Sequence, residues 1–220
     1  MLEDNEKTLL TLQKLIKSGT PKQYILFFKQ FHEADIAESL ASLTQKDRIQ
    51  FFNKVNPKLA AEILEELDLD QQIDVISKFK IDVAAKYIEE MEPDDAVDLL
   101  EELSETNELQ AQQIINALPD KEKNNIETLL AYEEGSAGSI MTSNHLTIPE
   151  NLRVEEALAY IKKTNPPESE LSFYIFIISK TNKLIGYTTL RDLVFCKNNE
   201  TVSNLRHEHN IYVNQFDDQE

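Results

Sequence analysis

A repeat of 24 residues constrains the fold of this 220-residue chain more than any other feature. A small residue marks one fixed point of each unit, at Ala37, Ala61 and Ala85. A period of this length is typical of stacked helical hairpins, in which each pair of short helices buries its apolar face only against its neighbours. The apolar positions that align at this spacing are Leu40, Leu64 and Ile88; Leu43, Leu67 and Met91; Ile49, Ile73 and Val97; and Phe52, Ile76 and Leu100.

Polar breaks at 44–46, 68–70 and 92–94 predict that every unit holds two helices. Pro93 suits the first turn of a helix, because a proline there loses no hydrogen bond. The period is clear from about residue 35 to 105 and fades on either side, as expected for end units that face water. A looser helix pair is predicted at about 109–118 and 120–132, and the Phe27, Phe28 and Phe31 cluster is predicted to lie in the core.

The pattern changes after residue 131. Strands are predicted at 144–149, 173–178 and 184–188, with helices at 154–161 and 190–196, the second of them capped by Thr189. We therefore expect an α+β chain with two domains. Residues 1–131 would form an all-α superhelical domain of short helix–turn–helix repeats, and residues 132–220 a partial α/β domain.

Negative charge is large and unevenly distributed. The net charge is −18, and residues 60–110 hold 17 Asp or Glu against three Lys, a net of 14 negative charges. This charge argues against nucleic acid or an anionic membrane as a direct partner and favours cations or basic partners. The one cysteine, Cys196, fits a reducing compartment, and no apolar stretch approaches the roughly 20 residues of a membrane helix, so we expect a soluble chain.

Two motifs indicate a family. Residues 132–142 read Tyr-Glu-Glu-Gly-Ser-Ala-Gly-Ser-Ile-Met-Thr, and residues 186–192 read Gly-Tyr-Thr-Thr-Leu-Arg-Asp. The first resembles the junction of MgtE-type magnesium transporters, where an acidic helical N-domain meets a CBS domain. The second fits the CBS pattern Gly-h-h-Ser/Thr-x-x-Asp, in which h is apolar or aromatic. The resemblance covers nearly the whole chain, with one complete CBS motif and the start of a second near residues 211–213.

The resemblance implies a set of metal ligands. Regulatory ions in that family are coordinated by a Glu in an Ala-Ala-Glu-h-Leu motif and by two Asp in an Asp-Asp-x-h-Asp motif, which match Glu62, Asp94 and Asp98. A backbone carbonyl matches Ser139, and a further carboxylate matches Glu220. The residues alone show that Asp94 and Asp98 share one helical face and that Mg²⁺ prefers oxygen ligands. The alternative for each acid is a solvated surface group.

The CBS motif also implies a nucleotide site. Thr189 and Asp192 would meet phosphate and ribose hydroxyls, with Arg191 and Tyr174 as candidate contacts to phosphate and base. The alternative is that Thr189 only caps its helix and Asp192 complements the first turn. The pair His207-x-His209 could bind a metal, but without a third ligand nearby in sequence a solvated turn is the preferred interpretation.

The resemblance implies the cytosolic Mg²⁺-sensing regulatory region of a magnesium transporter or channel, which closes the pore when Mg²⁺ bridges the N-domain and the CBS region. We expect it on the cytoplasmic side of a bacterial cell membrane, attached to the transmembrane domain of the intact protein. Mg²⁺ is the expected cofactor, ATP the second candidate ligand, and homodimerisation through the CBS region the expected assembly. Two alternatives stay open: an adenine-nucleotide-responsive CBS module, and an acidic helical-repeat scaffold. No catalytic motif indicates an enzyme.

Overall fold

The computed structural model describes residues 2–133, 135–164, 173–208 and 212–218, with the side chains of residues 2–5 left out. The chain divides into two compact units, residues 1–131 and 132–220, and each is described by itself. No helix in the described ranges combines the length and the apolar character that a membrane span needs.

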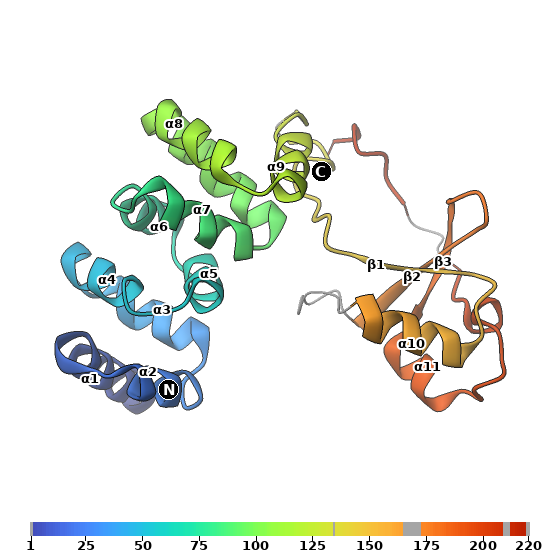
Figure 1. The fold of residues 1–220 in the computed structure, drawn as a ribbon, viewed down its shortest axis with the longest axis horizontal. Helices are drawn as coiled ribbons and strands as arrows, with labels where there is room; N and C mark the ends of the chain where they lie inside the picture. Colours follow the sequence, from blue (N-terminus) through green and yellow to red (C-terminus); the bar gives the residue numbers. More distant parts are fainter. Residues whose placement is uncertain (1, 134, 165–172, 209–211, 219–220) are drawn as a thin grey trace. The chain divides into compact units, whose positions relative to one another are not determined.

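Unit 1 is entirely helical over its described residues, and its elements follow one another as stacked layers (Figure 1). They are α1 (Leu2–Ser18), α2 (Pro21–Phe28), α3 (Glu33–Ala41), α4 (Gln45–Phe52), α5 (Pro57–Glu65), α6 (Leu69–Ile76), α7 (Ile81–Glu90), α8 (Pro93–Ala117) and α9 (Asp120–Leu129).

The helix boundaries confirm the repeat. Helices α3, α5 and α7 begin at residues 33, 57 and 81, and α4, α6 and α8 begin at 45, 69 and 93, so both sets advance by 24. The odd-numbered helices α1, α3, α5 and α7 pack in succession along one layer, while α4, α6 and α8 pack along the other. This is the arrangement of a helical solenoid, in which each unit contacts mainly its neighbours.

Small and branched residues fill the interface between successive units. Ala61, Leu64 and Phe52 are fully buried, and Ala85 and Ile88 are nearly so. The alanines let neighbouring helices approach closely, and the larger side chains supply most of the apolar area removed from water. In the predicted phenylalanine cluster, Phe27 is buried, whereas Phe28 and Phe31 are only partly covered.

The last helix pair differs from the prediction in one respect. α8 continues to Ala117, but Asn107 breaks its helical geometry with φ −154° and ψ 75°. The Asn107 side chain accepts a hydrogen bond from the Gln110 backbone N–H at 3.2 Å, as an N-cap residue does. The helix expected to begin near residue 109 is therefore present as the second segment of a kinked α8.

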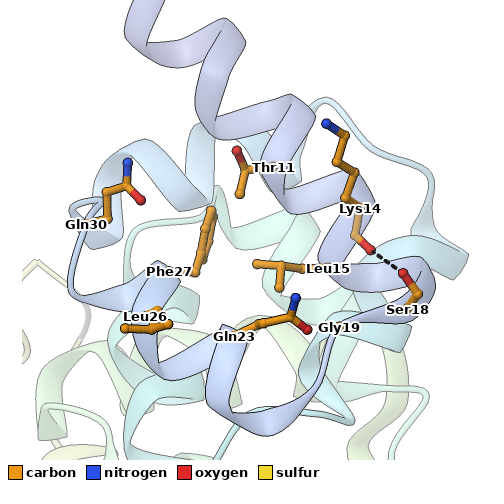
Figure 2. Close-up of a pocket in the computed structure, with 9 residues that line it drawn as sticks. All are labelled: Thr11, Lys14, Leu15, Ser18, Gly19, Gln23, Leu26, Phe27 and Gln30. Atoms are coloured by element: carbon orange, nitrogen blue, oxygen red, sulfur yellow. Dashed lines mark hydrogen bonds between the residues drawn. The ribbon is translucent and has the colours of Figure 1, made fainter.

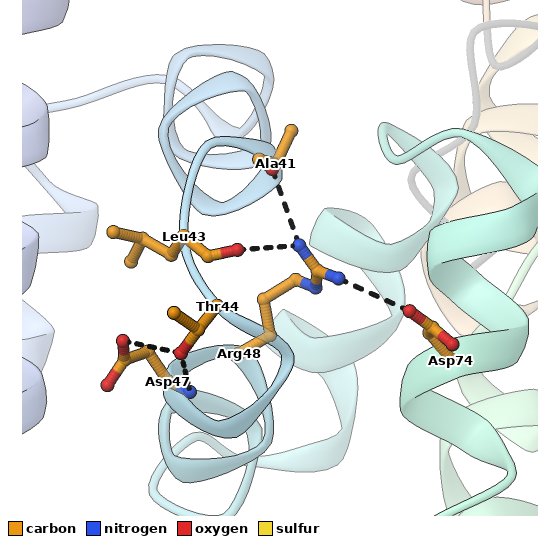
Figure 3. Close-up of polar contacts among 6 residues, drawn as sticks. All are labelled: Ala41, Leu43, Thr44, Asp47, Arg48 and Asp74. Carbon is orange, nitrogen blue, oxygen red and sulfur yellow. Dashed lines mark hydrogen bonds and ion pairs between the residues drawn. The ribbon is translucent and has the colours of Figure 1, made fainter.

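A polar side chain occupies the same position in two consecutive repeats. Arg48 on α4 is buried and donates to the backbone carbonyls of Leu43 at 2.9 Å and Ala41 at 3.3 Å, and it also reaches Asp74 Oδ2 on α6 at 3.3 Å (Figure 3). Gln72, 24 residues later, donates to the carbonyl of Leu67 at 2.8 Å. These donors provide partners for carbonyls at the turns between the paired helices, where the regular helical hydrogen bonds end.

Unit 2 is a small sheet covered on one face by two helices. Its elements are β1 (Leu146–Pro149), α10 (Val154–Thr164), β2 (Tyr174–Ile178), β3 (Leu184–Thr189), α11 (Leu190–Phe195) and the 3₁₀ turn η2 (Val202–Leu205). The strand order is β1-β2-β3, with β1 parallel and β3 antiparallel to β2. Ile148, Ile175, Ile177, Ala157 and Leu193 form the centre of its core. The predicted order of strands and helices is confirmed.

The junction and the chain's last residues pair within unit 2. The N–H groups of Ala137 and Gly138 donate to the carbonyls of Asp217 and Gln215, both at 2.8 Å. A side chain at Gly138 would meet the Gln215 carbonyl at 2.7 Å and the Tyr132 ring at 2.6 Å. The glycine in the junction motif is therefore required by close packing. A new strand was anticipated at 211–213; residues 212 and 213 are not in a strand, and residue 211 lies outside the described residues.

The buried donors of Arg48 give a first prediction. Arg48→Met keeps the length of the buried side chain but removes its hydrogen bonds to the carbonyls of Ala41 and Leu43, so we expect a loss of about 1–3 kcal/mol in the free energy of unfolding, measured by urea denaturation. Asp74→Asn is the matched control. Because the Asp74 side chain is 49% exposed, losing this ion pair should cost less than about 1 kcal/mol. Equal losses in the two variants would show that the ion pair is the important contact.

Candidate functional site

Carboxylates gather where the end of α5 meets the start of α8. Glu65 is the last residue of α5, and its Oε1 accepts a hydrogen bond from the Glu92 backbone N–H at 2.7 Å, immediately before α8 begins. Asp94 and Asp95 lie in the first turn of α8, and Asp98 lies one turn further on. A helix N-terminus favours negative charge, which explains why acids are tolerated here, but it does not offset so many of them.

The cluster raises the pKa values of its members. Burial raises the pKa of Glu65 to about 7, and the charges of Asp95, Glu92 and Glu62 add to the effect, while the hydrogen bond from Glu92 opposes it. Burial likewise raises the pKa of Asp95 to about 6, with further contributions from Asp94, Asp98, Glu92 and Glu66. The pKa of Asp98 is raised by partial burial and by the charge of Asp94. Ionised carboxylates are therefore unfavourable where the end of α5 meets the start of α8.

One oxygen of the cluster has the character of a cation ligand. Asp94 Oδ1 is buried and receives no hydrogen bond from the part of the chain that the structure describes. A buried carboxylate oxygen without a donor costs free energy, and a hard cation such as Mg²⁺ would compensate it. The residues present at the start of α8 therefore fit Mg²⁺ chemically.

Glu62 belongs to the same neighbourhood but has a competing contact. It lies on α5, where its carboxylate faces Lys58 Nζ at 3.8 Å, and its charge contributes to the raised pKa of Glu65. Among the described residues, no three Asp, Glu, His or Cys side chains form a ready-made metal cage. Mg²⁺ retains several waters and needs only one or two protein carboxylates, so a cage of three is not required.

The two other predicted ligands are placed differently. Ser139 lies in the junction of unit 2, where its hydroxyl donates to the Ser136 carbonyl at 2.8 Å. Glu220 falls outside the described residues. Within the described part of unit 2, residues 215–218 pair with residues 136–138 of the junction motif.

The CBS motif forms a complete capping box at the start of α11. Asp192 Oδ2 accepts from the Thr189 backbone N–H at 3.1 Å and from the Thr189 hydroxyl at 2.6 Å, while Thr189 Oγ1 accepts from the Asp192 N–H at 3.1 Å. The hydrogen bond from the Thr189 side chain is the main reason that the pKa of Asp192 is lowered, and His207 adds to it. Thr189 therefore caps the helix, as the structural alternative predicted.

A surface hollow of about 370 Å³ lies beside this motif. It is lined by Arg191, Asp192, Phe195, Cys196 and Leu205. Thus two of the four predicted nucleotide residues border one cavity. Tyr174 is exposed on β2, where its ring meets that of Tyr187 edge-on at 5.7 Å.

The sequence interpretation missed the role of His207. Its Nε2 lies 3.0 Å from Asp192 Oδ2, and its ring stacks on Tyr187 at 5.2 Å. His207 therefore contacts the CBS motif and does not lie in a turn, which was the preferred interpretation of the His207-x-His209 pair. His209 lies outside the described residues. No sequence spacing reveals this contact, because the two residues are 15 positions apart.

A second hollow, of about 290 Å³, lies between α1 and α2 at the N-terminal end of unit 1 (Figure 2). Leu15, Leu26 and Phe27 supply apolar walls, and Lys14 stands at the rim. None of the predicted site residues lines it. This hollow precedes the first clear repeat and belongs to the end of the solenoid.

Comparison with known proteins identifies both units. The family model for the MgtE intracellular N domain matches residues 31–135, and the CBS domain model matches residues 137–197. Curated relatives are the magnesium transporters MgtE of Thermus thermophilus, 29% identical over 109 residues, and of Enterococcus faecalis, 33% identical over 100 residues. These alignments cover 50% and 46% of this chain but only 24% and 22% of the relatives, so the chain spans about a quarter of their length.

Solved structures agree. A crystal structure of the soluble part of a magnesium transporter superposes with a TM-score of 0.87 at 28% identity, covering 98% of this chain and 83% of that one. The cytosolic domain of the Mg²⁺ channel MgtE in complex with ATP has a TM-score of 0.84 at 24% identity, covering 96% and 85%, and supports the fold. The chain therefore carries a domain of the MgtE intracellular N type over residues 31–135, followed by a CBS domain over residues 137–197.

Proposed function

We propose that this chain is the Mg²⁺-sensing regulatory region of a magnesium transporter or channel. In the intact protein it would lie on the cytoplasmic side of the membrane, joined to a transmembrane domain, and would close the pore when Mg²⁺ bridges the N-domain and the CBS region. The observation that carries the proposal is the carboxylate cluster between α5 and α8, in which Glu65 and Asp95 have raised pKa values and Asp94 has an orphaned oxygen.

The sensing step is electrostatic. At low Mg²⁺ the carboxylates of the cluster repel one another and any other acidic surface that approaches. A bound divalent cation cancels part of this charge, so it stabilises a state in which acidic surfaces come together. Asp94, Asp98 and Glu62 are the proposed ligands from the N-domain, and the Ser139 carbonyl and Glu220 are the proposed ligands from the CBS region.

Adenine-nucleotide binding by the CBS region is a second candidate function. The hollow beside α11 is bordered by the cationic Arg191 and by Asp192, which suit a phosphate and a ribose hydroxyl. A structural neighbour is described in complex with ATP. Regulation by nucleotide is compatible with Mg²⁺ sensing, because the two sites use different residues.

Removal of two proposed ligands tests the sensor. In the wild type, MgCl₂ should raise the melting temperature more than NaCl of equal ionic strength, since a ligand at a hundredfold excess over its Kd adds about 2.7 kcal/mol. Asp94→Asn with Asp98→Asn should abolish the Mg²⁺-specific part and leave the protein folded. The matched control is Glu89→Gln with Glu90→Gln, which removes two exposed charges from α7.

An unchanged Mg²⁺ response in the Asp94 and Asp98 double variant would remove these residues from the sensor. If MgCl₂ and NaCl had equal effects on the wild type, ionic screening alone would explain the response and no binding site would be needed.

The raised pKa of Glu65 predicts a pH dependence. A carboxyl group with a pKa of about 7 when folded, against an ordinary value of 4.5, binds its proton more tightly in the folded state. Its contribution to stability is therefore present below about pH 4.5 and is lost as the pH rises towards 7. We expect the melting temperature to fall between pH 5 and 8 in Mg²⁺-free buffer, and Glu65→Gln to flatten this slope and to raise the value at pH 8.

Glu105→Gln, which removes an exposed carboxylate from α8, is the control and should leave the slope unchanged. A Glu65→Gln variant with the wild-type slope would show that another group dominates the titration.

The proposed homodimer would form through the CBS region. α11 leaves Val194 59% and Phe195 83% exposed, which is unfavourable for apolar side chains unless a partner covers them. Sedimentation velocity of the whole chain should show concentration-dependent dimers, and Val194→Ser with Phe195→Ser should yield monomers. Ile25→Ser with Leu26→Ser on α2 removes comparable exposed apolar surface and should leave the dimer intact. A monomeric wild type at high concentration would contradict the proposal.

A further inference from the structure

Residue 207 reaches the CBS motif because Gly186 leaves room for it. The backbone of His207 pairs with Tyr187 through two hydrogen bonds, at 2.8 and 3.1 Å, beside β3. Gly186 has φ +155°, and a side chain there would meet the His207 carbonyl at 2.4 Å and the Arg206 Cγ at 2.6 Å. Only glycine allows both this backbone conformation and this approach. Because Gly186 has no side chain, the segment that carries His207 can pack directly against β3.

The imidazole then donates to the motif's carboxylate. Asp192 is an ionised acceptor whose pKa is lowered, so His207 Nε2 must be the donor in their 3.0 Å contact. Among the described residues, Asp192 Oδ2 accepts from three groups. Two of them belong to Thr189 and form the cap of α11. His207 supplies the third, and half of its side chain is exposed.

We propose that His207 is a latch on the nucleotide site, in which its imidazole takes the place of a ribose hydroxyl on Asp192 Oδ2. This inference rests on the nucleotide-binding candidate of the proposed function and adds a residue that determines its affinity. A ribose hydroxyl that donates to Oδ2 must exchange with the His207 donor, because this oxygen already accepts from three groups and the two Thr189 donors are part of the helix cap. The latch therefore weakens binding of any nucleoside with free ribose hydroxyls.

Replacing the donor while keeping the ring tests the latch. His207→Phe can still stack on Tyr187 but cannot donate to Asp192, so ATP should bind about five- to tenfold more tightly, the effect of about one hydrogen bond. The measurement is isothermal titration calorimetry of the full chain with ATP, with far-UV circular dichroism to confirm the fold. His145→Phe, an exposed histidine elsewhere in unit 2, should bind like the wild type.

A nucleotide without ribose hydroxyls separates the latch from a structural effect. 2′,3′-Dideoxy-ATP has no donor to place on Asp192, so its affinity should be the same for the wild type and for His207→Phe. Tighter binding of both nucleotides by the variant would indicate a change in the hollow and not a latch, and would overturn the inference.

The remaining outcomes are distinct. Binding of ATP by His207→Phe but not by the wild type would support a strong latch. Binding of ATP by the wild type with equal or weaker binding by His207→Phe would overturn the latch and leave the nucleotide candidate standing. Failure of both proteins to bind ATP would overturn the nucleotide candidate and the latch together, while the Mg²⁺ proposal would be unaffected.

Discussion

The burial of one apolar face in every 24 residues is the constraint on which the rest of unit 1 depends. Each helix pair is too short to be stable alone, so its stability comes from stacking on the pairs before and after it. Stacking at a fixed register also brings equivalent ends of successive helices together. The end of α5 and the start of α8 meet in this way, joined by the hydrogen bond from Glu92 to Glu65. The acidic cluster is thus a consequence of the same packing that holds the solenoid together.

In the carboxylate cluster, favourable apolar packing is opposed by unfavourable electrostatics. Apolar burial holds the helices in place, while the carboxylates they carry lose hydration and repel one another, as the raised pKa values of Glu65 and Asp95 record. A proton or a divalent cation relieves the same repulsion. We propose that the N-domain responds to Mg²⁺ through this charge, for which a preformed cage of ligands is not required.

The sequence predicted the parts of the fold that depend on periodicity. The helix pairs at spacing 24, the succession of strands and helices along the CBS unit and the Thr189 cap all follow from local patterns. Arg48 and Gln72 both donate to the backbone carbonyl five residues earlier. They occupy the same position of the repeat, but because one is an arginine and the other a glutamine, the repeat pattern did not reveal this common role. The kink at Asn107 was predicted only as a gap between two helices.

The site was less predictable, for a physical reason. Seventeen acids lie between residues 60 and 110, and local sequence does not say which of them the fold desolvates. Glu65 looks like Glu66 in the sequence, yet the former is half-buried against α8 and the latter is exposed. The Asp192–His207 contact joins elements that meet only after the sheet has formed. Its one local signal is Gly186, which was interpreted from the sequence only as a position of the CBS pattern.

Hydrogen–deuterium exchange of the whole chain, with and without Mg²⁺ at matched ionic strength, tests the central claim most directly. If Mg²⁺ binds the cluster, amides in residues 57–66 and 92–103 should gain protection, while those of α1 and α2 should exchange at unchanged rates. This local pattern would place the ion at the junction of α5 and α8. Equal protection with NaCl, or a gain spread evenly over unit 1, would contradict the account.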